Sequence, residues 1–302
     1  MKQKIDVIEV GPRDGFQSVK CAQITTEQKL KVIDDLVNAG VKHMEYTSFV
    51  SPKAIPQLSD AKAVTEVVLK KYPDVDLFAL VPNLRGAQNA YELGLRKVCY
   101  VVSLSASHNK ANINRTHEQS LEAYKEIRAA YPDLNVIVDL ATTFGCPFEG
   151  KYEDPAAVVK FLKDYKDAGM TTCCLCDTIG IADPAQVKAV IGAVKEAYPD
   201  LELMVHFHDT RGLGMVNTMA AMEAGVTKVQ SALGGLGGCP FAPGASGNLS
   251  TEDMVWMLNE MGYDTGISFS KILAAAKDQV KVISGNYSGH HINVEAETPC
   301  KA

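Results

Sequence analysis

The sequence contains no long apolar run, no block of like charges and no low-complexity tract. No stretch approaches the roughly 18 consecutive apolar residues of a transmembrane helix, and Met1–Val10 has no apolar core of the signal-peptide kind. Its 30 lysine and arginine residues are scattered and the formal net charge is −6, so nothing favours binding to nucleic acid or to a membrane surface. We therefore expect a cytoplasmic protein.

The chain also lacks the secretory context in which its eight cysteines would form disulfides. Disulfides are typical of secreted proteins, so we expect reduced thiols. Cys173, Cys174 and Cys176 look like a metal cluster by spacing alone, but the run from Thr171 to Asp177 is typical of a buried strand. We interpret these three as small core side chains.

The sequence does contain a regular alternation of short apolar segments with amphipathic stretches. Several amphipathic stretches end in Ala-Gly, where glycine favours a left-handed C-cap, and others end in Tyr-Pro-Asp, where proline stops a helix. The predicted strands are residues 5–10, 41–47, 76–81, 97–104, 135–140, 171–176, 202–207 and 228–231, and the predicted helices are 26–39, 60–72, 118–131, 155–168, 184–198 and 212–224.

Such alternation is typical of a parallel sheet built from βαβ units, and eight units predict a closed (β/α)8 TIM barrel. A doubly wound open sheet is the alternative, but no G-x-G-x-x-G turn follows the first strand. At 302 residues and 46% hydrophobic, the chain suits one large core. We predict a single domain over residues 1–302. The barrel would span about residues 4–262, and a short C-terminal extension, 263–302, would be helical around 270–282.

Polar residues follow several predicted strands at the end where barrel enzymes place their catalytic groups. The first strand ends in the run Glu9–Gln17, the second carries Glu45, and the sixth ends at Asp177. The seventh contains His206 and His208, and residues two apart on a strand point to the same side. Asp14 would lie near them in a closed barrel, so the three could hold a divalent ion; hydrogen-bonded core histidines are the alternative.

The eighth strand leads into a glycine-rich stretch, Gly234–Asn248, that contains one thiol, Cys239. Such a loop exposes backbone N–H groups and lets a ligand approach closely. A thiol near a cation is reactive as an acid or nucleophile. A flexible loop with an incidental cysteine is the alternative, and a phosphate cradle has weak support because no Lys-Ser/Thr pair follows.

Several stretches together resemble the 3-hydroxy-3-methylglutaryl-CoA lyase family, within a wider group of TIM-barrel metallolyases and Claisen-type synthases that share an Arg-Asp-Gly motif. The resemblance runs from about Ile5 to Gly266. The Gly-Gly-Cys-Pro loop is specific to the lyases, whereas Arg-Asp-Gly and His-x-His also occur in isopropylmalate and homocitrate synthases. The matching stretches are 9–15, 47–53, 81–86, 145–150, 177–180, 206–209, 237–242 and 244–248.

The resemblance implies a site residue by residue. Arg13 would polarise the thioester carbonyl, and Cys239 would exchange a proton with the enolate carbon. Glu45 and Asp177 would lie near the metal and the substrate hydroxyl. The implied ligands of Mg²⁺ or Mn²⁺ are Asp14, His206, His208 and Asn248; the implied catalytic residues are Arg13, Cys239, His206, Asp177 and Glu45; the implied supporting residues are Glu9, Gln17 and Glu252.

The implied reaction is a retro-Claisen cleavage of 3-hydroxy-3-methylglutaryl-CoA to acetyl-CoA and acetoacetate. A metal-bound hydroxyl loses its proton more readily, a base such as an acidic residue or a histidine takes that proton, and Arg13 stabilises the enolate. The pathways implied by the resemblance are leucine degradation and ketone-body metabolism.

Departures from the family pattern keep the acyl group open. Cys176 stands where glycine is usual, the segment 140–145 differs, and Arg211 replaces a frequent tyrosine. A lyase for another 3-hydroxyacyl-CoA, or a Claisen-type synthase, is the alternative, and a metal-dependent hydrolase or a non-catalytic CoA-binding protein has less support. Lys20, Lys110 and Arg115 could meet CoA phosphates, or a solvated loop could simply carry them. We further expect a homodimer, and Cys300 is either inert or redox-sensitive.

Overall fold

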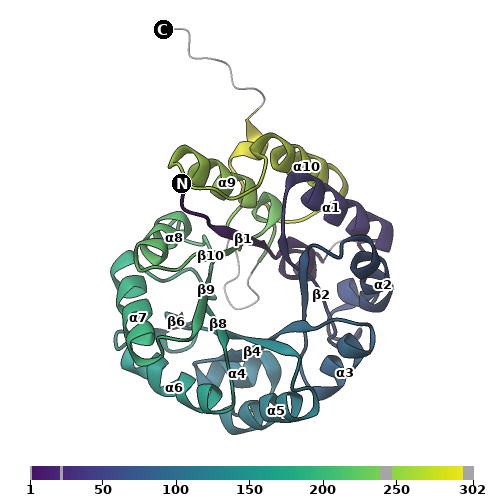
Figure 1. Cartoon of the computed structure of the whole chain (residues 1–302). Coiled ribbons are helices and arrows are strands. Elements are labelled where there is room, and N and C mark those ends of the chain that lie inside the picture. The colour runs from purple at the N-terminus through teal and green to yellow at the C-terminus, as the bar shows by residue number, and fades with distance from the viewer. Residues whose placement is uncertain (1, 21–22, 239–246, 295–302) are drawn as a thin grey trace.

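The computed structural model describes residues 2–20, 23–238 and 247–294. Eight parallel strands close into a barrel in the order β1-β10-β9-β8-β5-β4-β3-β2, and helices surround it (Figure 1). The predicted TIM barrel is therefore confirmed.

The barrel strands lie where the sequence predicts them, with ends that differ by no more than two residues. A small antiparallel pair, β6 (Gly145–Cys146) with β7 (Gly150–Lys151), lies outside the barrel. The barrel strands are β1 (Asp6–Glu9), β2 (His43–Ser48), β3 (Asp76–Leu80), β4 (Lys97–Ser103), β5 (Asn135–Ala141), β8 (Thr172–Asp177), β9 (Glu202–Phe207) and β10 (Lys228–Ser231).

The helices include the six that the sequence predicts. They are α1 (Thr26–Ala39), α2 (Ala61–Lys71), α3 (Leu84–Glu92), α4 (Ala106–Ile113), α5 (His117–Ala130), α6 (Ala156–Asp167), α7 (Pro184–Ala197), α8 (Gly214–Glu223), α9 (Thr251–Glu260) and α10 (Phe269–Val282).

Helices α3 and α4 were not predicted, and the solvated loop considered for Lys110 is instead the helix α4. The Ser105 side chain caps α4 by accepting a hydrogen bond from the His108 backbone N–H, and Asn114 ends the helix with φ 54°. Asn83 caps α3 in the same way, at the Gly86 N–H. Short side-chain caps of this kind satisfy N–H groups that the first helical turn leaves free.

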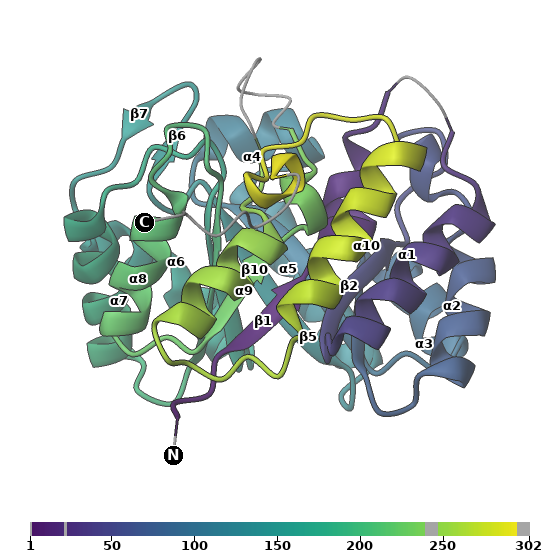
Figure 2. The ribbon, with the colours of Figure 1, turned by 90° about the horizontal axis from the view of Figure 1, so that it is seen from above.

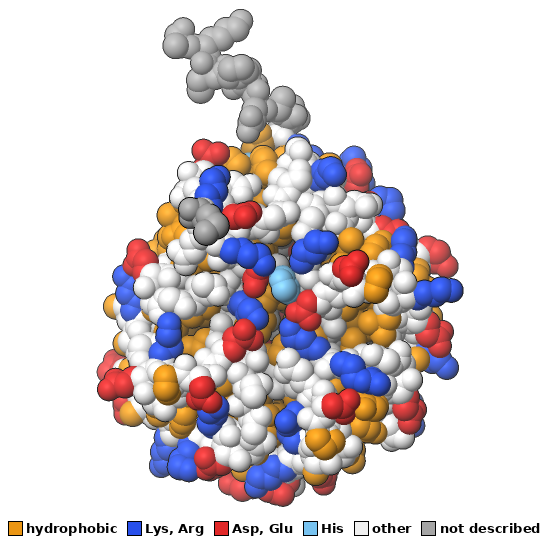
Figure 3. All heavy atoms as spheres, viewed as in Figure 1, with side chains coloured by type: hydrophobic (Ala, Val, Ile, Leu, Met, Phe, Trp, Pro, Cys, Tyr) orange, Lys and Arg blue, Asp and Glu red, His pale blue; other side chains and the backbone are white. Residues whose placement is uncertain are grey.

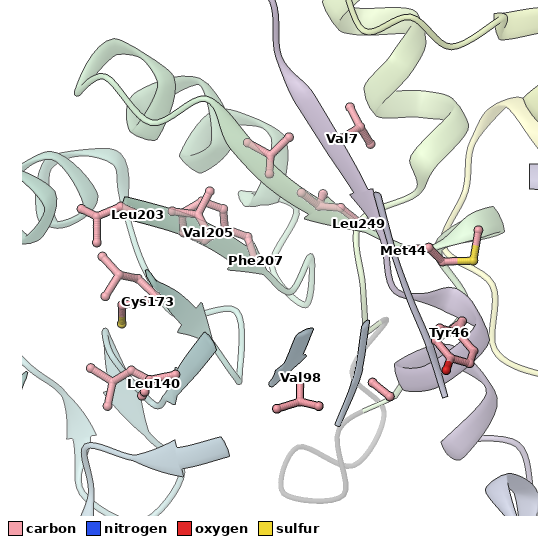
Figure 4. Packing of buried hydrophobic residues seen from close by; sticks show 14 of the residues in the cluster. Val7, Met44, Tyr46, Val98, Leu140, Cys173, Leu203, Val205, Phe207 and Leu249 are labelled. Carbon is pink, nitrogen blue, oxygen red and sulfur yellow. The ribbon is translucent and has the colours of Figure 1, made fainter. Parts of the chain in front are cut away.

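The hydrophobic core has two layers. The larger lies between the strands and the helices, and Figure 4 shows part of it, including Val98 on β4, Leu140 on β5 and Cys173 on β8. The smaller fills the inside of the barrel with alternate strand residues such as Phe78 and Cys174. Cys173 and Cys174 are thus core side chains, as interpreted from the sequence, whereas Cys176 is only partly buried.

Helix α10 belongs to the body of the fold. It packs beside α1 and α9 (Figure 2), and its buried face includes Ile272 and Ala276. Gln279 on the same helix donates a hydrogen bond from Nε2 to the Leu233 carbonyl, 3.0 Å away, just beyond β10. The predicted C-terminal extension therefore helps to close the ring of helices.

The amino-terminal end of the barrel carries paired charges at the starts of the strands. Asp76 contacts Lys97 at 2.5 Å and His43 at 3.0 Å, and Lys228 contacts Glu202 at 2.7 Å. Figure 3 shows charges of both signs gathered around a histidine near the centre of this end. Charged residues thus occur at both rims, and what distinguishes the opposite rim is the burial of its ionisable groups.

Candidate metal and substrate site

A pocket of about 500 Å³ lies at the carboxyl-terminal end of the barrel. The turn after β1 contributes Arg13, Asp14 and Gln17 to its lining, and β9 and the residue after it contribute His206 and His208. The position agrees with the rim expected from the sequence. In TIM barrels this rim is where catalytic groups collect.

Asp14, His206 and His208 form one cluster. Their potential ligand atoms all lie within 4.8 Å of one another, a spacing that could hold a metal ion. Asp14 belongs to the turn Gly11–Gly15 after β1. Strand order brings that turn close to β9, because only β10 separates the two strands.

Both imidazoles are neutral at pH 7, the form in which histidine binds a metal ion. Burial lowers the pKa of both, that of His208 to about 4. His206 Nδ1 lies 2.8 Å from Gln230 Oε1, and since an amide oxygen only accepts, Nδ1 carries the proton and Nε2 keeps its lone pair. His208 Nδ1 is buried without a hydrogen-bond partner in the described part of the chain.

Asn248 also contacts the cluster, through Asp14. Its Nδ2 donates to Asp14 Oδ2 at 2.7 Å and to the Leu236 carbonyl at 3.1 Å, while its Oδ1 is buried and finds no partner among the described residues. Gln17 Nε2 donates to the other oxygen of Asp14 at 2.9 Å. Burial alone would raise the pKa of Asp14, but the Arg13 guanidinium and the two imidazoles lower it to about 2.

Arg13 is held in place by two carboxylates. Its Nε and Nη2 donate to Glu45 at 2.6 and 2.8 Å, and its Nη1 donates to Asp14 at 2.6 Å. Glu45 is fully buried and also accepts a hydrogen bond from the Cys99 thiol at 2.9 Å. Glu45 therefore orients the guanidinium instead of presenting a free carboxylate to a substrate.

Glu9 and Glu252 tie the turn after β1 to the end of β10 and the start of α9. Glu9 accepts from the Gly11 and Leu233 N–H groups at 2.7 and 2.9 Å and from the Thr251 hydroxyl at 2.7 Å. Glu252 accepts from the Gly234 N–H at 2.9 Å. Burial raises the pKa of each to about 7. Their contacts fit the supporting role that the resemblance implies.

The carboxyl group of Asp177 binds the turn that follows β8. Its two carboxyl oxygens accept the backbone N–H groups of Ile181 and Ala182 at 3.0 and 2.9 Å, and Asp177 is not among the residues that line the pocket. A tight turn after β8 leaves these two N–H groups without backbone partners, and the carboxylate satisfies them. The residue that follows, Thr178, does line the pocket.

The residues suggested for CoA separate into two groups. Arg115 lines the pocket and donates to the Pro82 carbonyl at 2.9 Å. Lys20 and Lys110 are exposed and do not line it. Cys239 and Cys300 lie outside the described residues, although Gly238, next to Cys239, lines the pocket.

Among the pocket residues that sequence reasoning missed are Asp139 on β5 and Gln230 on β10. Asp139 and Gln230 are polar residues on the inward side of buried strands. A lone carboxyl group in the apolar run Val-Ile-Val-Asp-Leu was a usable signal, because buried carboxyl groups are rare without a purpose. Cys176 on β8 also lines the pocket; the sequence indicated it only as a core side chain and as a departure from the family pattern.

The chain matches the family model described as HMGL-like over residues 4–278. It is 41% identical over 277 residues to hydroxymethylglutaryl-CoA lyase of Bacillus subtilis, covering 91% of this chain and 92% of that protein. It is 40% identical to the human mitochondrial enzyme of the same name, covering 91% and 84% of the two chains.

Solved structures agree with the sequence matches. The Bacillus subtilis HMG-CoA lyase has a TM-score of 0.90 at 39% identity, with 97% of this chain and 98% of that chain covered. The Acinetobacter baumannii HMG-CoA lyase, solved with coenzyme A and 3-methylmalate, has a TM-score of 0.90 at 38% identity, with 98% and 96% covered. The carboxyl transferase domain of Rhizobium etli pyruvate carboxylase, at 18% identity and a TM-score of 0.70, covering 95% of this chain and 49% of that one, shares the fold alone.

Proposed function

Since the chain belongs to the HMGL-like family, we propose that it is a divalent-metal-dependent carbon–carbon lyase that cleaves 3-hydroxy-3-methylglutaryl-CoA to acetyl-CoA and acetoacetate. The observation that carries the proposal is the buried cluster of Asp14, His206 and His208 beside the Arg13–Glu45 pair. The named relatives, about 40% identical over most of the chain, support the same reaction.

The residues of the cluster fit a divalent ion. Asp14 supplies an ionised oxygen, His206 a free Nε2, and Asn248 an unpaired buried Oδ1. Mixed nitrogen and oxygen ligands suit Mg²⁺ or Mn²⁺, the ions we propose. When bound, such an ion would lower the pKa of the substrate's C3 hydroxyl.

The chain's own residues would perform the other steps. Arg13 has five N–H groups, three of which bind carboxylates. The two that remain, one on each terminal nitrogen, can donate to the thioester oxygen as it becomes an enolate. We propose that Cys239 then delivers a proton to C2.

The base that takes the hydroxyl proton is proposed to be a histidine of the pair, with His206 first. Because Nδ1 of His206 carries a proton, its Nε2 can act as the base only while it does not ligate the ion. Both acidic alternatives are occupied, since Glu45 binds Arg13 and Asp177 binds two backbone N–H groups. We accordingly propose Asp177 as a positioning residue for the turn that carries Thr178.

The location of the protein, its oligomeric state and its contacts with CoA are also proposals. We propose a cytoplasmic homodimer that acts on an acyl-CoA, because the relatives named above are acyl-CoA lyases. No helix in the described part of the chain is both long enough and apolar enough to cross a bilayer. For CoA itself we propose Arg115, which lines the pocket, as a phosphate contact, with Lys20 and Lys110 as weaker candidates.

Product analysis tests this proposal. The protein, supplied with Mg²⁺ or Mn²⁺ and a thiol reductant, is incubated with 3-hydroxy-3-methylglutaryl-CoA, and acetyl-CoA and acetoacetate are quantified together. Equal amounts of both products are expected, with loss of activity after chelation. Free acid and CoA without acetoacetate would identify a hydrolase. In a separate incubation with acetyl-CoA and a keto acid, consumption of both would identify a synthase.

A related acyl group is the second candidate. The Acinetobacter baumannii structure holds coenzyme A together with 3-methylmalate, a dicarboxylic acid shorter than methylglutarate. A 3-hydroxyacyl-CoA of that length is therefore included in the same assay. A higher kcat/KM for it would move the acyl assignment and leave the reaction type unchanged.

A further inference from the structure

Asp139 is a buried carboxyl group that the mechanism above does not use. It lies on β5, is 5% exposed and lines the pocket. Its Oδ1 has no hydrogen-bond partner among the residues that the structure describes. Leaving a buried polar atom unpaired is destabilising, so the atom is expected to meet a partner that the pocket receives.

The guanidinium near Asp139 is already engaged by other carboxylates. Potential ligand atoms of Glu45, Cys99 and Asp139 lie within 4.8 Å of one another, but Arg13, the nearby guanidinium, already donates two hydrogen bonds to Glu45 and one to Asp14. Burial, followed by the charge of Glu45, raises the pKa of Asp139 to about 8. At neutral pH the group is mostly a carboxylic acid, which can donate a hydrogen bond.

The inside of the barrel below Asp139 is apolar. Ile137 on the same strand belongs to the inner core with Phe78 and Cys174. Asp139 is therefore a polar group where the pocket meets the core, well placed for the end of a short acyl chain rather than for the nucleotide of CoA. Pockets of this type use a few polar groups among apolar ones to select their ligand.

We propose that Asp139 is a specificity-determining residue, whose carboxyl group hydrogen-bonds to a carboxylate oxygen at the far end of the acyl chain and so favours 3-hydroxyacyl-CoA substrates with a second carboxyl group. This inference rests on the proposed function. It adds the residue by which the pocket would recognise the second carboxyl group of that substrate.

The test compares two thioesters that differ only at that end. One is 3-hydroxy-3-methylglutaryl-CoA, and the other is 3-hydroxy-3-methylbutyryl-CoA, which has the same hydroxyl and methyl groups but no second carboxylate. For each, kcat, KM and the dissociation constant are measured with wild type, Asp139→Leu and Asp139→Asn. A hydrogen bond to a charged group is worth about 1.5–3 kcal/mol, which corresponds to roughly 10- to 150-fold in affinity.

The expected result is a change in the ratio of the dissociation constants of the two thioesters. Asp139→Leu should weaken binding of the dicarboxyl thioester at least about tenfold, mainly through KM, and should change binding of the other thioester by less than about threefold. Asp139→Asn keeps a donor of the same size, so its ratio should stay within a few-fold of wild type. Cys99→Ala, which alters the same cluster from a position outside the pocket lining, should leave the ratio unchanged.

Two results would overturn the inference. If both Asp139→Leu and Asp139→Asn weaken binding of the two thioesters by the same factor, the role of Asp139 is packing. Tighter binding of the dicarboxyl thioester to Asp139→Asn would show that the native group is ionised and repels it. If wild type binds both thioesters but cleaves neither, the proposed reaction fails, while the dissociation constants still decide the role of Asp139.

Discussion

Arg13 shows how individual side chains are fixed before any ligand arrives. Its guanidinium is buried and held by Glu45 and Asp14, so little reorganisation is needed when negative charge develops on a substrate oxygen. A lysine cannot reproduce this planar, two-sided arrangement.

Arg13→Lys is therefore expected to lower kcat by about 100- to 1,000-fold while KM changes much less. Steady-state kinetics on 3-hydroxy-3-methylglutaryl-CoA measure both constants. Arg96→Lys, at an exposed position on the opposite rim, serves as the matched control and should keep wild-type kcat. A kcat for Arg13→Lys within tenfold of wild type would rule out Arg13 as the main stabiliser of the enolate.

Gln230 fixes the proton of His206 through the 2.8 Å contact with Nδ1. Removing such a partner typically costs 10- to 100-fold in metal affinity, because the imidazole is no longer held in the ligating tautomer. Gln230→Ala should weaken Mn²⁺ binding by about this factor in calorimetric titrations, and Gln88→Ala, on the exposed face of α3, should not. Unchanged affinity in Gln230→Ala would show that the tautomer is fixed in another way.

The metal cluster could be predicted from the sequence because strand periodicity and barrel closure place Asp14 beside His206 and His208. The hydrogen-bond partners of Asp177 could not be predicted, because they are two backbone N–H groups in a turn whose shape the sequence does not reveal. Asp139 was overlooked for a related reason. Its importance depends on the absence of a partner for its Oδ1, which only the packed structure shows.

At the scale of elements, the strands were predicted closely because each is short, apolar and bounded by turn residues. Helices α3 and α4 were missed because their signals are single capping residues, Asn83 and Ser105, rather than long periodic patterns. Short helices depend on caps more than long ones do, since fewer internal hydrogen bonds offset the cost of nucleation.

The capping box of α5 gives a test at this scale. The Thr116 side chain accepts from the Gln119 N–H, while the Gln119 side chain accepts from the Thr116 N–H. Thr116→Ala should lower the free energy of unfolding by about 1 kcal/mol without changing kcat/KM. Urea titrations of this variant are compared with Thr171→Ala, a control at an exposed position outside the helices. An equal loss in both would mean that the cap contributes nothing specific.

At the scale of the whole molecule, Glu9 joins the first and last strands of the barrel. Its pKa is raised by burial to about 7 in the folded protein, above the usual value of about 4.3 for an unfolded chain. The folded state therefore binds the proton more tightly. This contribution to stability is fully present below about pH 4 and is lost as the pH rises through 7.

Glu9→Gln removes this titration and keeps the size of the side chain. The free energy of unfolding of wild type, relative to the variant, should fall by up to about 1.4 kcal/mol per pH unit between pH 5 and pH 7. Urea unfolding at several pH values measures the difference. A difference that is constant or grows with pH in this range would contradict a raised pKa for Glu9.

The most direct test of the central claim joins metal binding to carbon–carbon cleavage in one variant. Bound Mn²⁺ per chain and the release of acetyl-CoA from 3-hydroxy-3-methylglutaryl-CoA are measured for wild type, for His208→Ala and for the control His117→Ala, which lies in α5 away from the cluster. We predict one high-affinity ion and cleavage in wild type and the control, with both lost together in His208→Ala. Cleavage that persists in His208→Ala without bound metal would contradict the account.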